Sequence, residues 1–205
     1  MEHKQQVEHP RRGRPRSETA RKGILGATAE LLLADGLEAV TMDEVAEHAG
    51  VSKATIYRWW PTKESLALEA LLEEWDTTPP TPRDTGSLRG DLLALIRPWI
   101  RRLRARPYGR VIAALITEAQ TDPAFGKVYR ARFLERRRDP ARVLFGRAIE
   151  RAEIPAGTDV EIALDLIFGP IYHRLLHGHA PLTDGFAQAA VDSALAGFVA
   201  RRTRT

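Results

Sequence analysis

Apolar residues recur three and four positions apart along most of the chain, which is the spacing of one face of an α-helix. The first such run goes from Ile24 to Leu32. It stops before Gly36, a residue type that readily takes the left-handed conformation found after helices. β-branched residues nowhere alternate convincingly with polar ones, and the chain has no internal repeat. The pattern therefore predicts an all-α fold.

Helix start and stop signals divide this pattern into about nine helices. Ser17, Thr41 and Ser52 stand where N-cap residues are expected, and Glu44 follows Thr41 at the spacing of a capping box. The expected helices cover residues 17–35, 41–50, 52–60, 62–75, 88–106, 108–121, 123–151, 158–178 and 183–202. Residues 76–86 are rich in proline and are expected to form a linker.

Two of these helices contain internal prolines, at Asp139-Pro140 and at Gly169-Pro170. Proline cannot donate the helical hydrogen bond, and its ring clashes with the carbonyl of the preceding turn. Both helices should therefore kink or break at these positions.

Residues 41–60, TMDEVAEHAGVSKATIYRWW, give the sharpest signal. Two short helices meet at Gly50, which permits a tight turn, and Ser52 caps the second helix. The inward stripe is expected to comprise Val45, Ala46, Ala49, Val51 and Ile56, packed on Ile24 and Leu25. The outward surface is expected to carry Lys53, Ala54, Thr55, Tyr57, Arg58 and Trp59. Phosphates and base edges require such cations, hydroxyls and flat rings, so the pattern indicates a helix-turn-helix.

An ordinary helical hairpin is the competing interpretation, because glycine-containing turns between helices are common. That interpretation must also account for two aromatic and two cationic side chains that face outward next to a basic arm. We therefore favour nucleic-acid binding.

The formal net charge is +4, and basic residues crowd the first stretch: Lys4, Arg11, Arg12, Arg14, Arg16, Arg21 and Lys22. Residues 1–16 lack apolar periodicity and are expected to form a disordered arm. Within it, Arg12-Gly13-Arg14-Pro15 matches the core of an AT-hook. Pro15 would keep Arg14 extended, and Gly13 would let the backbone approach a narrow minor groove. The alternative is a solubilising tail with diffuse attraction to DNA.

The stretch from residue 41 to residue 66, ending IYRWWPTKESL, resembles the TetR family of bacterial regulators. The likeness continues more loosely through GSLRGDLLALIR, ALDLIFGPIYHRLL and the last helix, which are similar to an actinobacterial-type subgroup of its C-terminal domains. This resemblance implies an N-terminal three-helix DNA-binding domain joined to a C-terminal helical bundle that dimerises and binds a ligand.

The resemblance also implies roles for single residues. Thr41 and Thr55 would bond phosphates, Lys53 and Ala54 would enter the major groove, Tyr57 and Trp59 would brace the backbone, Arg58 would reach a base or phosphate, and Lys63 would bind a phosphate. The family often has His, Tyr or Phe where this chain has Trp59, so packing competes with hydrogen bonding as the role of that side chain.

Large apolar residues are frequent after residue 88, and a plain hydrophobic core accounts for any single one of them. The resemblance implies a ligand cavity inside this bundle. Its expected lining is Trp99, Phe125, Tyr129, Phe133, Phe168 and Tyr172. Aromatic rings with an occasional hydroxyl suit a small apolar effector. No charged residue clearly points inward in the pattern, so the sequence names no ligand.

The last two predicted helices carry small residues: Ala163, Gly169, Ala187, Ala190, Ala194 and Gly197. Small residues permit close helix crossings, and in the family this helix pair forms the contact between two copies. Packing within one chain is the alternative. A homodimer is expected, since helix-turn-helix proteins generally bind two half-sites of an inverted repeat.

Two further clusters are given structural interpretations. His173, His177 and His179 lie at or near metal-ligand spacing, but Gly178 should end the helix and no third ligand is fixed, so no metal is expected. The arginines at residues 136–138 lie beside acidic residues and are expected to form a solvated, partly paired face.

These expectations divide the chain into a basic arm (residues 1–16), a helix-turn-helix domain (17–65) and a ligand-binding and dimerisation domain (66–205). The predicted function is sequence-specific transcriptional regulation, as a cytoplasmic, nucleoid-associated repressor released by a small effector. A non-specific DNA-coating protein is one alternative. An enzyme is the other, but the chain has no cysteine, no phosphate-binding glycine loop and no defensible pair of carboxylates. We expect no cofactor and no membrane span.

Overall fold

The computed structural model describes residues 14–74, 83–105 and 107–199, and within them it contains helices and no strand. The elements are α1 (Arg14–Asp35), α2 (Met42–Ala49), α3 (Lys53–Tyr57), α4 (Lys63–Glu74), α5 (Leu88–Arg104), α6 (Tyr108–Thr121), α7 (Pro123–Tyr129), the π-helical turn η1 (Arg130–Leu134), α8 (Glu135–Glu150), α9 (Val160–His177) and α10 (Asp184–Val199). Because α7, η1 and α8 follow without a gap, they form one continuous helical run. Counted in this way, the described residues contain the nine helices that the sequence predicts.

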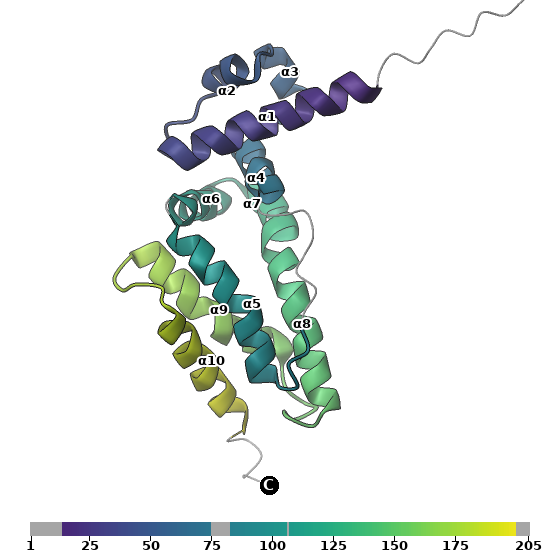
Figure 1. The fold of residues 1–205 in the computed structure, drawn as a ribbon, viewed down its shortest axis with the longest axis vertical. Helices are drawn as coiled ribbons and strands as arrows, with labels where there is room; N and C mark the ends of the chain where they lie inside the picture. The colour runs from purple at the N-terminus through teal and green to yellow at the C-terminus, as the bar shows by residue number, and fades with distance from the viewer. Residues whose placement is uncertain (1–13, 75–82, 106, 200–205) are drawn as a thin grey trace, which may run out of the picture.

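The helices form a small head and a larger body (Figure 1). In the head, α1 lies across α2 and α4, and α2 contacts α3. In the body, α5 packs on both α8 and α10, and α9 packs on α8, α10 and α6. Helix α4 contacts α6 and α7 as well as α1, so it joins the two parts, and the predicted domain boundary after residue 65 falls inside it. One hydrophobic cluster continues from the head into the body.

The first helix begins earlier than predicted. Helix α1 starts at Arg14 rather than Ser17, with Pro15 in the first turn, where a missing N–H has little cost. The predictions that residues 14–16 belong to a disordered arm and that Pro15 keeps Arg14 extended are therefore wrong. Residues 1–13, which include Arg12, and residues 76–82 of the predicted linker lie outside the described residues.

Of the predicted kinks or breaks at prolines, the breaks do not occur. Helix α8 continues through Pro140 and α9 through Pro170, and α5 likewise continues through Pro98. The irregular turn lies instead at η1, upstream of Pro140. Tertiary contacts override the local penalty of about 3 kcal/mol, because Pro140 is buried and side chains on both sides of it bind α9.

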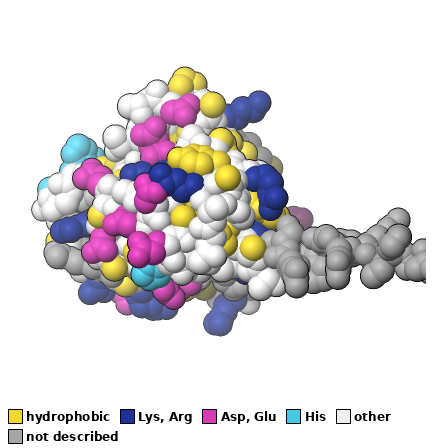
Figure 2. Space-filling view, turned by 90° about the horizontal axis from the view of Figure 1, so that it is seen from above, with side chains coloured by type: hydrophobic (Ala, Val, Ile, Leu, Met, Phe, Trp, Pro, Cys, Tyr) yellow, Lys and Arg dark blue, Asp and Glu magenta, His cyan; other side chains and the backbone are white. Residues whose placement is uncertain are grey.

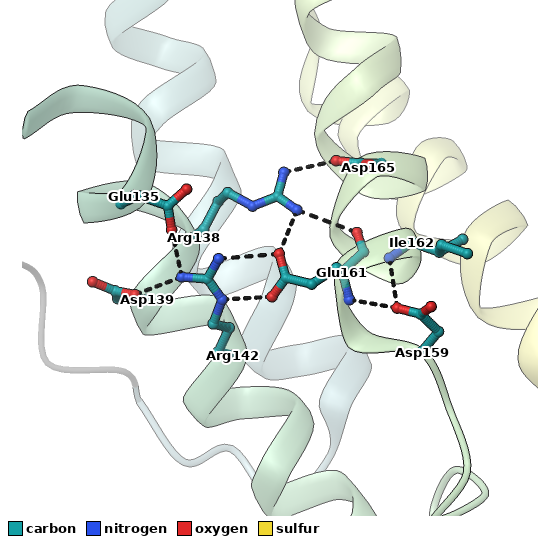
Figure 3. Close-up of polar contacts among 8 residues, drawn as sticks. All are labelled: Glu135, Arg138, Asp139, Arg142, Asp159, Glu161, Ile162 and Asp165. Carbon is teal, nitrogen blue, oxygen red and sulfur yellow. Dashed lines mark hydrogen bonds and ion pairs between the residues drawn. The ribbon is translucent and has the colours of Figure 1, made fainter. Parts of the chain in front are cut away.

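Those side chains form an ion-pair network between α8 and α9 (Figure 3). Arg138 lies 2.7 Å from both Glu161 and Asp165, and Arg142 Nε lies 2.7 Å from Glu161 Oε1. Arg142 also contacts Glu135 and Asp139 on its own helix. Hydrogen bonds from Arg142 and Arg138 lower the pKa of Glu161 to about 2.

We predict that Glu161→Gln lowers the melting temperature by about 2 °C near neutral pH, a modest loss because the network is exposed to solvent. The Glu161 pKa is lower in the folded protein than in an unfolded chain, where it is about 4.3. Its contribution is therefore present above pH 4.3 and disappears as the pH falls towards 2. Melting curves of both proteins between pH 7 and pH 3 check this, and a difference that grows towards low pH would contradict it.

Candidate DNA-binding surface and effector site

Hydrogen bonds at both helix starts fix the geometry of the α2–α3 hairpin. The Thr41 hydroxyl accepts from the Glu44 N–H at 3.2 Å, and the Thr41 N–H donates to Glu44 Oε2 at 2.9 Å, which confirms the predicted capping box. Gly50 ends α2 with φ +63°, in the left-handed region that favours glycine. Ser52 Oγ then accepts from the Thr55 N–H at 3.2 Å and starts α3.

The predicted inward stripe is confirmed. Val45 and Ile56 are fully buried, Ala46 is buried, and Ala49 and Val51 pack partly buried against the same cluster as Ile24 and Leu25. This packing fixes how α3 is rotated on the head, so the same side chains always face outward. The short helix thus obtains from the core the stability that five residues cannot supply alone.

The outer face of α3 presents cations and one large ring. Lys53, Ala54, Tyr57 and Arg58 are exposed, with 51% of Tyr57 accessible, and Thr55 is partly buried. Seen from above, the head mixes Lys and Arg side chains with Asp and Glu (Figure 2). One such pair joins Lys53 Nζ to Asp43 Oδ1 at 2.6 Å.

Trp59 differs from the prediction, because it does not share this outer face. Its ring is partly buried and stacks on Trp60 with centroids 6.1 Å apart, and Arg58 lies 6.0 Å from its centroid. The indole N–H is buried and has no hydrogen-bond partner within the described part of the chain. A ring on the buried side of a helix end is stabilised by packing. Of the two roles considered for Trp59, packing therefore fits the structure and hydrogen bonding does not.

Thr41 lies just before the start of α2, and Lys63 lies at the start of α4. The Thr41 hydroxyl donates to Glu44 Oε2 at 2.9 Å as well as accepting from the Glu44 N–H. The hydroxyl and the N–H of Thr41 both donate to the Glu44 carboxylate, and these two bonds lower the pKa of Glu44. Lys63 is the first residue of α4, whose start is capped by Thr62 Oγ1 accepting from the Ser65 N–H at 3.1 Å.

The six aromatic residues predicted to line a ligand site come together in the body. Ring contacts link Phe125 to Tyr129 at 6.4 Å and Tyr129 to Phe133 at 5.1 Å. On the other side, Trp99 contacts Phe168 at 5.7 Å and Tyr172 at 5.4 Å, both edge-on. We call these six residues the aromatic cluster. It draws on α5, α7, η1 and α9, elements far apart in the sequence.

Arg137 joins the two halves of the aromatic cluster. Its guanidinium carbon lies 4.4 Å from the Phe133 centroid and 5.1 Å from the Trp99 centroid. The predicted pairing with carboxylates is found for Arg138, but the prediction of a solvated arginine face is wrong for Arg137, which packs on two rings. The sequence did contain a signal: Tyr129, Phe133 and Arg137 follow at intervals of four, the spacing of one helix face.

The π-helical turn improves that alignment. Intervals of four advance slightly beyond a full α-helical turn, whereas the wider π turn at Arg130–Leu134 falls short of one, so the two deviations offset each other. The turn also contains Arg132, the residue immediately before Phe133, and points it towards α4. π turns of this kind are frequent at functional sites.

Glu69 on α4 connects the π turn to the head. One carboxylate oxygen lies 2.9 Å from Arg21 of α1, and the other lies 2.7 Å from Arg132 of η1. Trp60, at the end of the helix-turn-helix, also donates a hydrogen bond to it. Burial raises the pKa of Glu69, but its three partners lower it more, so the net shift is downward. Sequence reasoning missed this group, because its partners lie 48 and 63 residues away.

An apolar strip runs along the exposed side of α9. Ile162, Leu166 and Leu176 are 57%, 50% and 46% accessible, and they share a helix face with Gly169. The predicted contact through small residues is wrong for Ala163, Ala187 and Ala194, which are buried within the chain. They allow α10 to pack closely on α5 and α9, and Phe198 packs edge-on to Phe145.

The histidine cluster lies at the end of α9. The His173 ring centroid is 4.6 Å from that of His177 and 5.0 Å from that of His179, and Gly178 ends the helix with φ +62°, as predicted. Across residues 14–74, 83–105 and 107–199, no group of three or more His, Cys, Asp or Glu side chains is arranged to hold a metal ion. In the same ranges, no helix has the length and apolarity that crossing a membrane requires.

Comparison with known proteins agrees with this arrangement. A family model described as bacterial regulatory proteins of the tetR family matches residues 24–70, and one described as a tetracycline-repressor-like C-terminal domain matches residues 82–194. The HTH-type transcriptional regulator YdeS of Bacillus subtilis is 40% identical over 187 residues, which cover 91% of this chain and 93% of YdeS.

Two further likenesses extend over most of the chain. The DNA-binding transcriptional repressor TetR of Mycobacteroides abscessus is 32% identical over 181 residues, 88% of this chain and 94% of that protein. The crystal structure of the TetR family transcription regulator SCO0332 superposes with a TM-score of 0.72 at 37% identity and covers 87% of this chain and 97% of its own. The chain therefore belongs to the TetR family of DNA-binding transcriptional regulators.

Proposed function

We propose that this protein is a cytoplasmic homodimeric repressor that binds an inverted-repeat operator through α3 and releases it when a small molecule binds at the aromatic cluster. The observation that carries the proposal is the combination of an exposed, basic α3 with an aromatic cluster that reaches the head through Glu69. The repressor TetR of Mycobacteroides abscessus, by its name, has the same sign of regulation.

On this proposal, α3 enters the major groove. Lys53 and Ala54 at its start approach base edges, and Arg58 reaches a base or a phosphate. Tyr57 packs against the DNA backbone. Lys53 leaves its ion pair with Asp43 and contacts the DNA instead. This change has a low cost, because both side chains of the pair are exposed.

Residues around α3 position the head on the phosphates. Thr55 and Thr41 donate to phosphates once their hydroxyls turn from Ser52 and Glu44, and Lys63 binds a phosphate from the start of α4. Arg12 and Arg14 contact the minor groove beside the half-site. Trp59 supports α3 from behind, because its ring packs on Trp60.

The effector acts through the π turn. A ligand among Trp99, Phe133 and Tyr172 displaces the rings that line η1, and Arg132 in that turn moves with them. Arg132 holds Glu69, which in turn holds Arg21 of α1. A shift of η1 therefore changes the angle of the head, and the two heads of a dimer no longer match both half-sites.

Selection of genomic fragments with the purified protein, followed by footprinting, tests the proposal. We expect two protected half-sites related by a two-fold axis, about 34–36 Å or a multiple of it apart. Binding that shows no preferred sequence and collapses at raised salt would indicate a non-specific DNA-coating protein instead.

We predict that Tyr57→Ala and Lys63→Ala each weaken operator binding about tenfold without altering the fold. Loss of Lys63 should act equally on all sequences and reduce the slope of log affinity against log salt by about one, because one phosphate contact is lost. Lys127→Ala on the exposed side of α7 is the control. Unchanged affinity in both variants, at native circular dichroism, would remove these residues from the DNA interface.

A second prediction concerns the dimer. Leu166→Glu places a charge in the middle of the apolar strip on α9 and should convert dimers into monomers at micromolar concentration, with weak operator binding. The matched control is Val143→Glu, an equally exposed apolar site on α8. Sedimentation velocity distinguishes the outcomes. A wild-type monomer, or a Leu166→Glu dimer as stable as the control, would count against this interface.

A third prediction concerns Glu69. Glu69→Gln should lower the free energy of unfolding by about 1–2 kcal/mol, because two guanidiniums lose a partly buried partner. Since the Glu69 pKa is lowered by folding, the stabilisation is present above pH 4.3, the approximate unfolded value, and disappears as the pH falls. Glu73→Gln, exposed on the same helix, serves as control, and denaturant unfolding at several pH values measures both. An equal loss in the two variants would show that Glu69 has no special role.

A further inference from the structure

Hydrogen-bond donors lie close together at the aromatic cluster. Trp99 is buried, and its indole N–H has no hydrogen-bond partner within the described residues. Such an N–H can only donate, and burying it without a hydrogen bond costs about 1–3 kcal/mol. The Arg137 guanidinium beside it likewise only donates, and the Tyr129 and Tyr172 hydroxyls can donate as well.

The electrostatic field at the aromatic cluster favours negative charge. Burial is the main cause that lowers the pKa of Arg137 to about 10, which leaves the guanidinium charged at neutral pH; Tyr172 and Tyr129 oppose this shift, and Arg136 and Arg102 add to it. Burial also raises the pKa of Tyr129 and Tyr172, so both phenols are neutral there. The rings around Arg137 keep water away, which strengthens its attraction for an anion.

We propose that the effector is an aromatic carboxylate, whose oxygens accept hydrogen bonds from Arg137 and the Trp99 indole and whose ring packs against the rings of the aromatic cluster. This inference rests on the proposed function, since it names the ligand class of the same site. It goes beyond the small apolar effector expected from the sequence.

Geometry separates this class from the other ligand classes. A carboxylate matches the planar fork of a guanidinium with two parallel bonds, whereas a cationic ligand would be repelled by the Arg137 guanidinium. An aromatic body gains offset or edge contacts with the rings of Phe133, Trp99 and Tyr172, beyond the area it buries. A neutral apolar ligand would leave the Trp99 N–H without an acceptor.

The test uses the full-length protein and a panel of planar aromatic carboxylates that includes benzoate, 2-naphthoate and indole-3-carboxylate. Each is paired with its primary amide and its aminomethyl cation, which have nearly the same shape. Calorimetry without DNA measures affinity, and displacement of the selected operator fragment is measured separately. The variants are Arg137→Gln, Trp99→Phe and, as control, Arg130→Gln, an exposed arginine of the same helical run.

We expect at least one carboxylate to bind tenfold or more tightly than its amide. Arg137→Gln should remove this preference, Trp99→Phe should weaken the carboxylate about tenfold, and Arg130→Gln should change neither affinity. Melting curves verify that each variant is folded. Trp99→Phe supplies the answer if Arg137→Gln does not fold.

The inference is overturned if no carboxylate binds at millimolar concentration, if amides or cations bind as tightly in every pair, or if the preference persists in Arg137→Gln. A neutral compound that displaces DNA would overturn this inference while supporting the proposed function. A carboxylate that binds at Arg137 without displacing DNA would support the ligand class and contradict effector-controlled release.

Discussion

The ionic contacts between head and body meet at one partly buried carboxylate. Glu69 has 15% of its side chain accessible, and it is bonded to cations from α1 and from η1. Removing it from water has a cost, which its partners offset only while Arg21, Arg132 and Trp60 all stay in reach. Any displacement of η1 against the head therefore weakens several bonds at once, so the junction favours one defined geometry over a continuous range.

In the body, the helical run from α7 to α8 connects the aromatic cluster to Glu69. The continuous helical run from α7 to α8 passes the rings of Tyr129 and Phe133, then Arg137, and then the arginines that bind α9. Its two ends are fixed by different contacts, with α7 against α6 and α8 against α5 and α9. The π turn lies between these fixed ends, next to both the aromatic cluster and Glu69. A ligand at the aromatic cluster thus contacts the least regular turn of the run.

Local sequence signals predicted the local structure well. The capping box at Thr41, the left-handed Gly50 and Gly178 and the cap at Ser52 depend on neighbours within a few residues, and all are confirmed. The aromatic cluster was also predicted, because its six residues are large and apolar and the family resemblance implied a cavity there. Arg137 was missed because a run of three arginines reads as solvated, although its spacing of four residues from Phe133 distinguishes it as the one that turns inward. The break predicted at Pro140 does not occur, because the local signal ignores the contacts with α9 that keep the helix intact.

A double-mutant cycle on operator affinity tests the central claim that the Arg132–Glu69 contact sets the angle of the head. Glu69→Gln, Arg132→Gln and the double variant would be compared with the wild type on the selected operator, at one salt concentration. We predict that each single change weakens binding and that the double variant is no weaker than either one, a coupling of about 1 kcal/mol or more. Additive effects of the two changes, or undiminished affinity in all three variants, would contradict it.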